Sequence, residues 1–180
     1  IINSKIKKAE ESANKIVGST KLLAVSKLQP NERVLNVLKQ GHQIFGENKV
    51  QEALSKWLMF RENFSNIKVH LIGPLQSNKM RHAVKAGFEL IHSLDSLERL
   101  QRLDGICREE GRVQPVLLQI NISGEPSKSG MNPEEVISTL NAAVHLTSLE
   151  IQGLMTMPPL TRDPADAAPY FSELRSLRDR

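Results

Sequence analysis

Hydrophobic and polar residues follow two different rhythms along the chain. Short, largely apolar runs, typical of strands buried on both faces, occupy residues 22–26, 43–46, 69–73, 90–92, 116–121 and 151–155. Between these runs, apolar residues recur every three or four positions, which indicates amphipathic helices. Helices are predicted over residues 3–17, 30–40, 49–60, 77–86 and 96–110, with two more that begin near Pro133 and by Pro169. After one leading helix, the chain is therefore expected to alternate strand and helix.

Alternating strands and helices predict a parallel sheet with right-handed crossover connections. Two architectures satisfy this pattern, an open doubly wound sheet and a closed (β/α)8 barrel of the TIM-barrel type. The strands are brief and each strand–helix unit spans roughly 25–30 residues, which favours the barrel. Six units are two short of closure, and the pattern stops inside a helix at Arg180. We therefore expect one barrel domain over residues 1–180 that contains about six units and lacks the last two.

The composition is that of an ordinary globular domain. Of the 180 residues, 39% are hydrophobic and 24% are charged, which is close to the globular average and excludes a disordered or collagen-like chain. No apolar run approaches the ~18 residues that a membrane span requires. The net charge is only +4 and aromatic residues make up 4%, so the chain lacks the basic patch and stacking platforms of a nucleic-acid binder. We expect neither a membrane nor a nucleic acid as a partner.

The residues that commonly bind metals are sparse. Cys107 is the single cysteine, which excludes an internal disulfide and any multi-cysteine metal site and favours a reducing, cytoplasmic compartment. His70 and His92 lie on neighbouring predicted strands, but no third ligand follows at a suitable spacing. We expect these histidines to pack in the core or a pocket, and we predict no metal site.

Functional residues in both candidate architectures lie where strands end and loops begin. Lys27 directly follows the first predicted strand. A lysine partly withdrawn from water has a lowered pKa, and its neutral amine can form a Schiff base with an aldehyde or ketone. The alternative is a lysine whose ammonium group stays in solvent. Position alone favours this alternative.

Five sequence motifs favour the Schiff-base lysine instead. They are LLAVSK at residues 22–27, FGENKVQEA at 45–53, HLIGPLQSNK at 70–79, HSLDS at 92–96 and QINISGE at 119–125. In this order and at this spacing, the motifs resemble those of the pyridoxal phosphate homeostasis proteins. The resemblance extends over nearly the whole chain, and it implies the barrel fold of the alanine racemase N-terminal domain.

The resemblance also implies which residues bind pyridoxal 5'-phosphate. Lys27 corresponds to the lysine that holds the cofactor as a Schiff base. Asn48 corresponds to an asparagine near the 3' oxygen of the cofactor ring, and an amide can donate a hydrogen bond to that oxygen. Met155 and Thr156 correspond to the end of the sixth strand, near the pocket. Lys128 corresponds to a lysine in the loop after the fifth strand, either as a secondary cofactor contact or as a solvated charge.

The function implied by the resemblance is that of a non-catalytic carrier in vitamin B6 and amino-acid homeostasis, whose partner is the cofactor itself. The alternative is an amino-acid racemase on the same barrel. Racemases of this fold place a second acid–base group, a tyrosine, on a separate C-terminal domain, whereas Tyr170 is the single tyrosine here and lies on the last predicted helix. We therefore expect no catalysis, and we expect a monomer, with a weak dimer as the alternative.

One further expectation concerns the end of the chain. Members of this family continue beyond the position of Arg180 with a serine-rich turn and an Arg-Ile-Gly segment, which supply most of the phosphate-binding groups. Barrels of this type commonly bind phosphate after strands seven and eight. We therefore expect weaker cofactor retention than in a longer member.

Overall fold

A parallel sheet forms the centre of the molecule. The computed structural model describes residues 1–126 and 128–180. Within them, the strands are β1 (Ala24–Val25), β2 (Ile44–Glu47), β3 (Lys68–Leu71), β4 (Leu90–Leu94), β5 (Gln114–Gln119) and β6 (Leu149–Met155). Each strand pairs in parallel with the next one along the chain. This order without reversal is that of a barrel, because a doubly wound sheet reverses its strand order. The predicted parallel sheet is confirmed.

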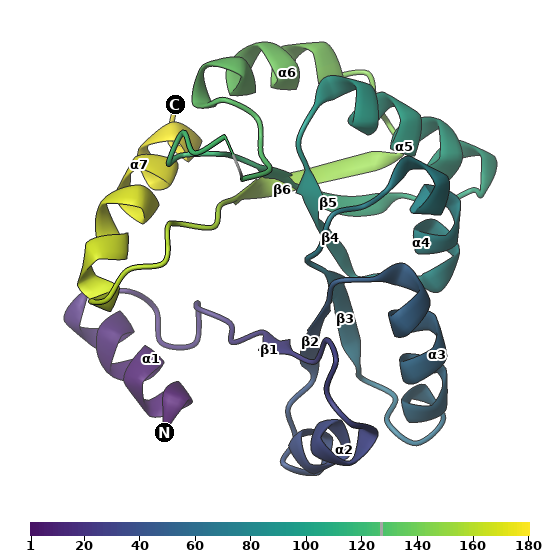
Figure 1. Ribbon diagram of the computed structural model, residues 1–180, viewed down its shortest axis with the longest axis vertical. Helices are drawn as coiled ribbons and strands as arrows, with labels where there is room; N and C mark the ends of the chain where they lie inside the picture. Colours follow the sequence, from purple (N-terminus) through teal and green to yellow (C-terminus); the bar gives the residue numbers. More distant parts are fainter. Residues whose placement is uncertain (127) are drawn as a thin grey trace.

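Helices surround the sheet. They are α1 (Ile2–Ser12), α2 (Asn31–Lys39), α3 (Val50–Arg61), α4 (Met80–Ala86), α5 (Leu97–Glu109), α6 (Val136–Ala143) and α7 (Ala168–Arg178), with 3-10 turns at Ser77–Lys79, Pro133–Glu135 and Pro164–Ala167. Figure 1 shows α2 to α6 in an arc outside the strands, while α1 and α7 lie near each other on the side away from β3. The strand–helix units thus form a partial (β/α) barrel. Among the described residues, every helix is too short or too polar to cross a lipid bilayer.

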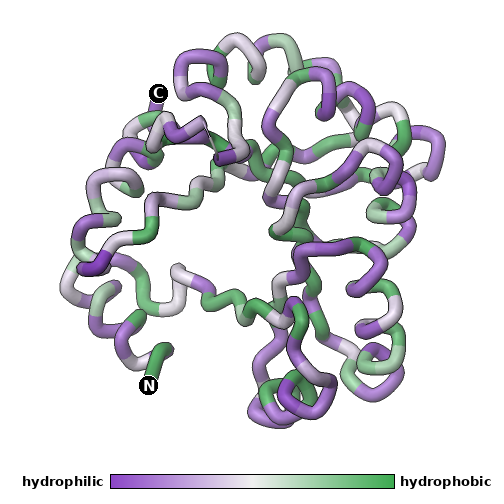
Figure 2. Tube along the Cα trace, in the orientation of Figure 1, coloured by the Kyte–Doolittle hydropathy of each residue, from purple (hydrophilic) through white to green (hydrophobic). Residues whose placement is uncertain are grey.

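The hydrophobic core lies between the sheet and the surrounding helices. The ring of Trp57 on α3 packs 4.7 Å from that of Phe45 on β2 and 5.6 Å from that of Phe60, measured between centroids. Cys107 on α5 is fully buried. Trp57, Phe60 and Cys107 therefore serve packing. Figure 2 shows hydrophobic positions along the strands and their alternation with hydrophilic ones along the helices, so the core follows the pattern read from the sequence.

Helix α1 ends earlier than predicted. The apolar spacing predicted a helix over residues 3–17, whereas α1 ends at Ser12. Asn14 adopts a left-handed φ of 51°, which takes the backbone out of the helical path. The carboxylate of Glu10 accepts hydrogen bonds from the amides of Gly18 at 2.7 Å and Thr20 at 2.5 Å. These bonds fix the following segment as a loop that leads to β1.

Helix α5 begins with a different cap from the one predicted. Asp95 directly precedes the helix predicted over residues 96–110, and its residue type predicts it as the N-cap. In the structure Ser96 takes this place, and its Oγ accepts the amide of Arg99 at 3.4 Å. The carboxylate of Asp95 instead pairs with the guanidinium of Arg99 at 3.2 Å. Serine and aspartate are equally good caps. The carboxylate of Asp95 is engaged by the guanidinium of Arg99, which leaves Ser96 as the cap.

Candidate functional site

Lys27 lies in a tight turn at the carboxyl end of β1. The amide of Ser26 extends the strand pairing by donating to the carbonyl of Gly46 at 3.0 Å, and the amide of Gln29 closes the turn onto the carbonyl of Ser26 at 3.1 Å. Leu28, within the turn, has a left-handed φ of 57°. The Lys27 side chain is exposed. Its amine is therefore accessible from solvent, and the role of Lys27 as a Schiff-base lysine stays a prediction.

Asn48 lies at the neighbouring strand end. Val25 pairs with Gly46, so Lys27 and Asn48 each come two residues after the same pair, on strands that run about 4.8 Å apart. A Cβ added to Gly73, just beyond β3, would lie 2.3 Å from the Asn48 carbonyl oxygen. Only glycine therefore fits where the chain after β3 passes Asn48. The structure brings the predicted lysine and asparagine to one edge of the sheet.

Buried polar side chains pack beneath the strand ends that carry Lys27 and Asn48. Ser26, Glu47 and Lys56 are all less than 9% exposed. Glu47 Oε1 accepts hydrogen bonds from Ser26 Oγ at 2.8 Å, Lys56 Nζ at 3.0 Å and Trp57 Nε1 at 3.1 Å. Glu47 Oε2 is buried and has no hydrogen-bond partner among the residues that the structure describes. The ion pair with Lys56 makes Glu47 a structural salt-bridge partner at this site.

Lys56 was missed by sequence reasoning. Its ammonium group also contacts Glu52 Oε1 at 2.9 Å. Burial acts to lower the pKa of Lys56, but the hydrogen bonds to Glu52 and Glu47 outweigh it and leave this pKa raised. The pKa of Glu52 is lowered, chiefly by the hydrogen bond from Lys56 and against its own burial. The four-residue spacing of Glu52 and Lys56 on one helix was the only available signal, and it describes an ordinary surface pair equally well.

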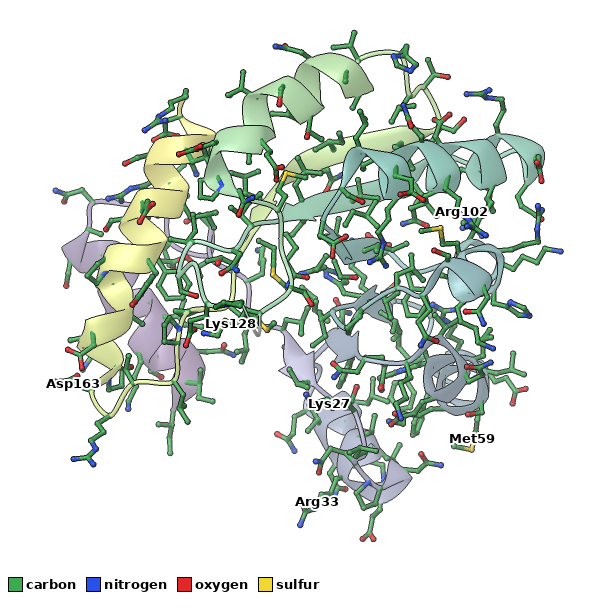
Figure 3. The ribbon with its side chains drawn as sticks, turned by 45° about the horizontal axis from the view of Figure 1, so that its top comes forward. Lys27, Arg33, Met59, Arg102, Lys128 and Asp163 are labelled. Atoms are coloured by element: carbon green, nitrogen blue, oxygen red, sulfur yellow. The ribbon has the colours of Figure 1, made fainter. Side chains whose placement is uncertain are left out.

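The remaining predicted site residues, Met155, Thr156 and Lys128, lie at or beyond the ends of β5 and β6, away from β1 and β2. Thr156 Oγ1 donates to the carbonyl of Ile120 at 2.8 Å, and the carbonyl of Met155 accepts the amide of Ile120 at 2.8 Å. Lys128 Nζ lies 2.5 Å from Glu125 Oε2 within the loop after β5. Figure 3 shows Lys27 beyond β1 and Lys128 in that loop. The structure therefore joins Lys27 with Asn48, and separately ties Thr156 and Met155 to the start of the loop that carries Lys128.

A hollow opens beside Asn48. It has a volume of about 460 Å³, and its lining includes Asn48, Lys49, Pro74 and Lys79. Lys27 is not among the lining residues. The hollow lies against the beginning of α3. Two lysines and three residues with side-chain amides, Asn48, Gln51 and Gln76, thus line a space next to the strand end that carries Lys27.

A larger hollow of about 780 Å³ includes His70 and His92 in its lining. His70 Nδ1 and His92 Nε2 are 2.9 Å apart, within hydrogen-bond distance. Burial, together with the neighbouring His70, lowers the pKa of His92 to about 4, so this ring is neutral at pH 7. The described residues contain no group of three or more potential metal ligands. The histidines line a pocket and pair with each other.

Comparisons with known proteins place the chain among relatives of similar architecture. The family model described as alanine racemase, N-terminal domain, matches residues 2–180. The pyridoxal phosphate homeostasis protein of Aquifex aeolicus (strain VF5) is 35% identical over 175 residues, which cover 97% of this chain and 75% of the relative. The protein of the same name from Vibrio alginolyticus is 37% identical over 179 residues, covering 98% and 76%. The chain thus spans about three quarters of the length of these relatives.

Solved structures give the same picture. PipY of Synechococcus elongatus PCC7942, determined with PLP bound, is 33% identical, with a TM-score of 0.82 over 97% of this chain and 80% of PipY. The alanine racemase of Clostridium difficile 630 is 16% identical, with a TM-score of 0.72 over 99% of this chain and 46% of the racemase. At that identity the racemase shows the fold alone. The expected barrel of the alanine racemase N-terminal type is confirmed.

Proposed function

We propose that this chain, which belongs to the alanine racemase N-terminal domain family and within it to the pyridoxal phosphate homeostasis proteins, binds pyridoxal 5'-phosphate covalently through Lys27. The observation that carries the proposal is the exposed amine of Lys27 on a hydrogen-bonded turn, next to Asn48 on the adjoining strand. We assign residues 1–180 to one pyridoxal phosphate-binding barrel domain.

The donor groups at this edge fit the chemistry of the cofactor. The neutral amine of Lys27 can add to the aldehyde carbon, and loss of water then leaves a carbon–nitrogen double bond. The Asn48 side chain carries an NH2 group that can donate to the phenolic oxygen of the ring. We assign Met155, Thr156 and Lys128 to the opposite side of the pocket, where the hydroxyl of Thr156 is already bonded to the Ile120 carbonyl.

We further propose that the protein carries and buffers the cofactor rather than catalysing a reaction. Racemisation needs an acid–base group on each face of the substrate carbon. Tyr170, the single tyrosine, lies on α7 outside the sheet, and the likeness to alanine racemase extends to the fold. Sequestration of a reactive aldehyde at Lys27 supports a role in the cytoplasmic homeostasis of the cofactor and of amino acids.

The proposal is tested by titrating the purified chain with pyridoxal 5'-phosphate and recording the absorbance spectrum. The expected result is a saturable band of the imine, which Lys27→Ala abolishes. Lys39→Ala is the matched control, because Lys39 is an exposed lysine on α2, and it should leave the band unchanged. An equal band in the Lys27→Ala protein would overturn the assignment.

A further inference from the structure

The turn that carries Lys27 rests on buried polar groups instead of hydrophobic side chains. Ser26 is tied down on its backbone and side chain, because its carbonyl accepts Lys56 Nζ at 2.7 Å and its Oγ donates to Glu47 Oε1 at 2.8 Å. Both partners are buried, Glu47 at 0% and Lys56 at 8% exposure. The residue immediately before Lys27 is therefore held by two side chains from β2 and α3.

The residue immediately after Lys27 is held in a similar way. Leu28 adopts a left-handed φ of 57°, a conformation that is unfavourable for residues with a side chain. Its amide donates to Glu52 Oε1 at 2.7 Å. Strained backbone persists only where the surroundings hold it. Glu52 therefore retains Leu28 in this conformation, together with the hydrogen bond from the Gln29 amide to the Ser26 carbonyl.

Lys56 connects Glu47 and Glu52, the two carboxylates that hold Ser26 and Leu28. Its ammonium group has three N–H donors, and they meet three oxygens: the Ser26 carbonyl at 2.7 Å, Glu52 Oε1 at 2.9 Å and Glu47 Oε1 at 3.0 Å. The donors of Lys56 are thus fully used within this cluster. Each carboxylate in turn contacts a residue that flanks Lys27.

We propose that Glu47, Lys56 and Glu52 form a positioning unit that fixes the backbone on both sides of Lys27 and so aims its amine at the aldehyde. This inference rests on the proposed function, because it assigns the unit's purpose through Lys27. Stability alone does not explain the unit, since well-packed apolar residues commonly replace a buried ion pair without loss. The unit acts through Lys27 and does not itself touch the cofactor.

Variants of Glu52 separate its hydrogen bond from its charge. Glu52→Gln keeps an oxygen that can accept the Leu28 amide, whereas Glu52→Ala removes it. Hydrogen exchange at the Leu28 amide, followed by NMR, reports this anchor without any cofactor present. We expect exchange about tenfold faster in Glu52→Ala than in Glu52→Gln, and cofactor affinity about tenfold weaker, as loss of one neutral hydrogen bond implies.

The double variant Glu47→Gln/Lys56→Met separates positioning from stability. Removing Glu47 and Lys56 together avoids leaving either charge buried and unpaired, and the remaining Glu52 side chain is 21% exposed and reaches solvent. The melting temperature should therefore stay close to that of the wild type. Cofactor affinity should still fall about tenfold, because Ser26 loses its contact with Lys56. Glu89→Gln is the control, since Glu89 forms an exposed ion pair with Lys68 at 2.7 Å, and it should change neither quantity.

The possible outcomes distinguish the two proposals. If the wild type forms the covalent adduct and the folded double variant binds as tightly as the wild type, the positioning proposal is wrong and the proposed function stands. If the wild type forms no adduct on Lys27, the proposed function fails. In that case unchanged exchange at the Leu28 amide in Glu52→Ala would also refute the anchor, while faster exchange would leave a unit that holds the turn without serving the cofactor.

Discussion

At the scale of single residues, the carboxylate of Glu10 fixes the path by which the chain approaches the sheet. Glu10 reaches from α1 to the loop before β1, and its carboxylate accepts the amides of Gly18 and Thr20. These backbone hydrogen bonds, in spite of the opposing effect of desolvation, lower its pKa from 4.5 to about 2. The apolar spacing around Glu10 gave no hint of this loop, because the pattern reports which side chains are apolar and not where a carboxylate finds its donors.

The lowered pKa of Glu10 predicts a pH dependence of stability. A carboxylate with a lowered pKa in the folded state stabilises the fold above its unfolded pKa, and this contribution is lost as the pH falls. The window therefore extends from about pH 4.5 down to about pH 2. In Glu10→Gln, thermal unfolding should show a flatter decline of stability across this window than in the wild type. Glu11→Gln, which alters an exposed pair with Lys7, should retain the wild-type slope, and identical slopes in all three proteins would contradict the prediction.

At the scale of secondary structure, the strand ends place the candidate site. The sequence predicted each strand and helix, because apolar runs and helical periodicity reflect the two environments of a barrel. It predicted the boundaries less well, and the fourth helical segment, residues 77–86, divides into a 3-10 turn and α4. That Lys27 and Asn48 serve one site could be anticipated only through family resemblance. Lys56 could not be singled out, because its contact with Ser26 joins residues 30 positions apart and its spacing from Glu52 is that of an ordinary surface pair.

The close approach at Gly73 gives a prediction at this scale. Gly73→Ala would place a methyl group 2.3 Å from the Asn48 carbonyl oxygen, so the two strand ends must separate. We expect a loss of about 1–3 kcal/mol in the free energy of unfolding together with weaker cofactor binding. Gly105→Ala is the matched control, because Gly105 lies in α5 with no atom within 4 Å of the added Cβ. This change should stabilise the helix by about 0.5–1 kcal/mol, and equal effects at both glycines would refute the role of the close approach.

At the scale of the whole molecule, the sheet and its surrounding helices form a scaffold whose carboxyl edge carries the proposed cofactor site. Ligands that bind only the folded state raise its stability by mass action. At a cofactor concentration of roughly one hundred times Kd, this amounts to about 2.7 kcal/mol, or a rise in melting temperature of about 5–10 °C for a domain of this size. The rise should be absent in Lys27→Ala. A similar rise in that variant would show that the cofactor binds elsewhere on the chain.

The most direct test of the central claim is to locate the covalent bond. The chain is incubated with pyridoxal 5'-phosphate, reduced with borohydride, digested and mapped by mass spectrometry. We predict one dominant modified residue, Lys27, with modification of the other lysines at the low level that they also show in the Lys27→Ala protein. Modification spread evenly over the exposed lysines, or concentrated on Lys128 or Lys49, would contradict the assignment of Lys27 as the cofactor-binding residue.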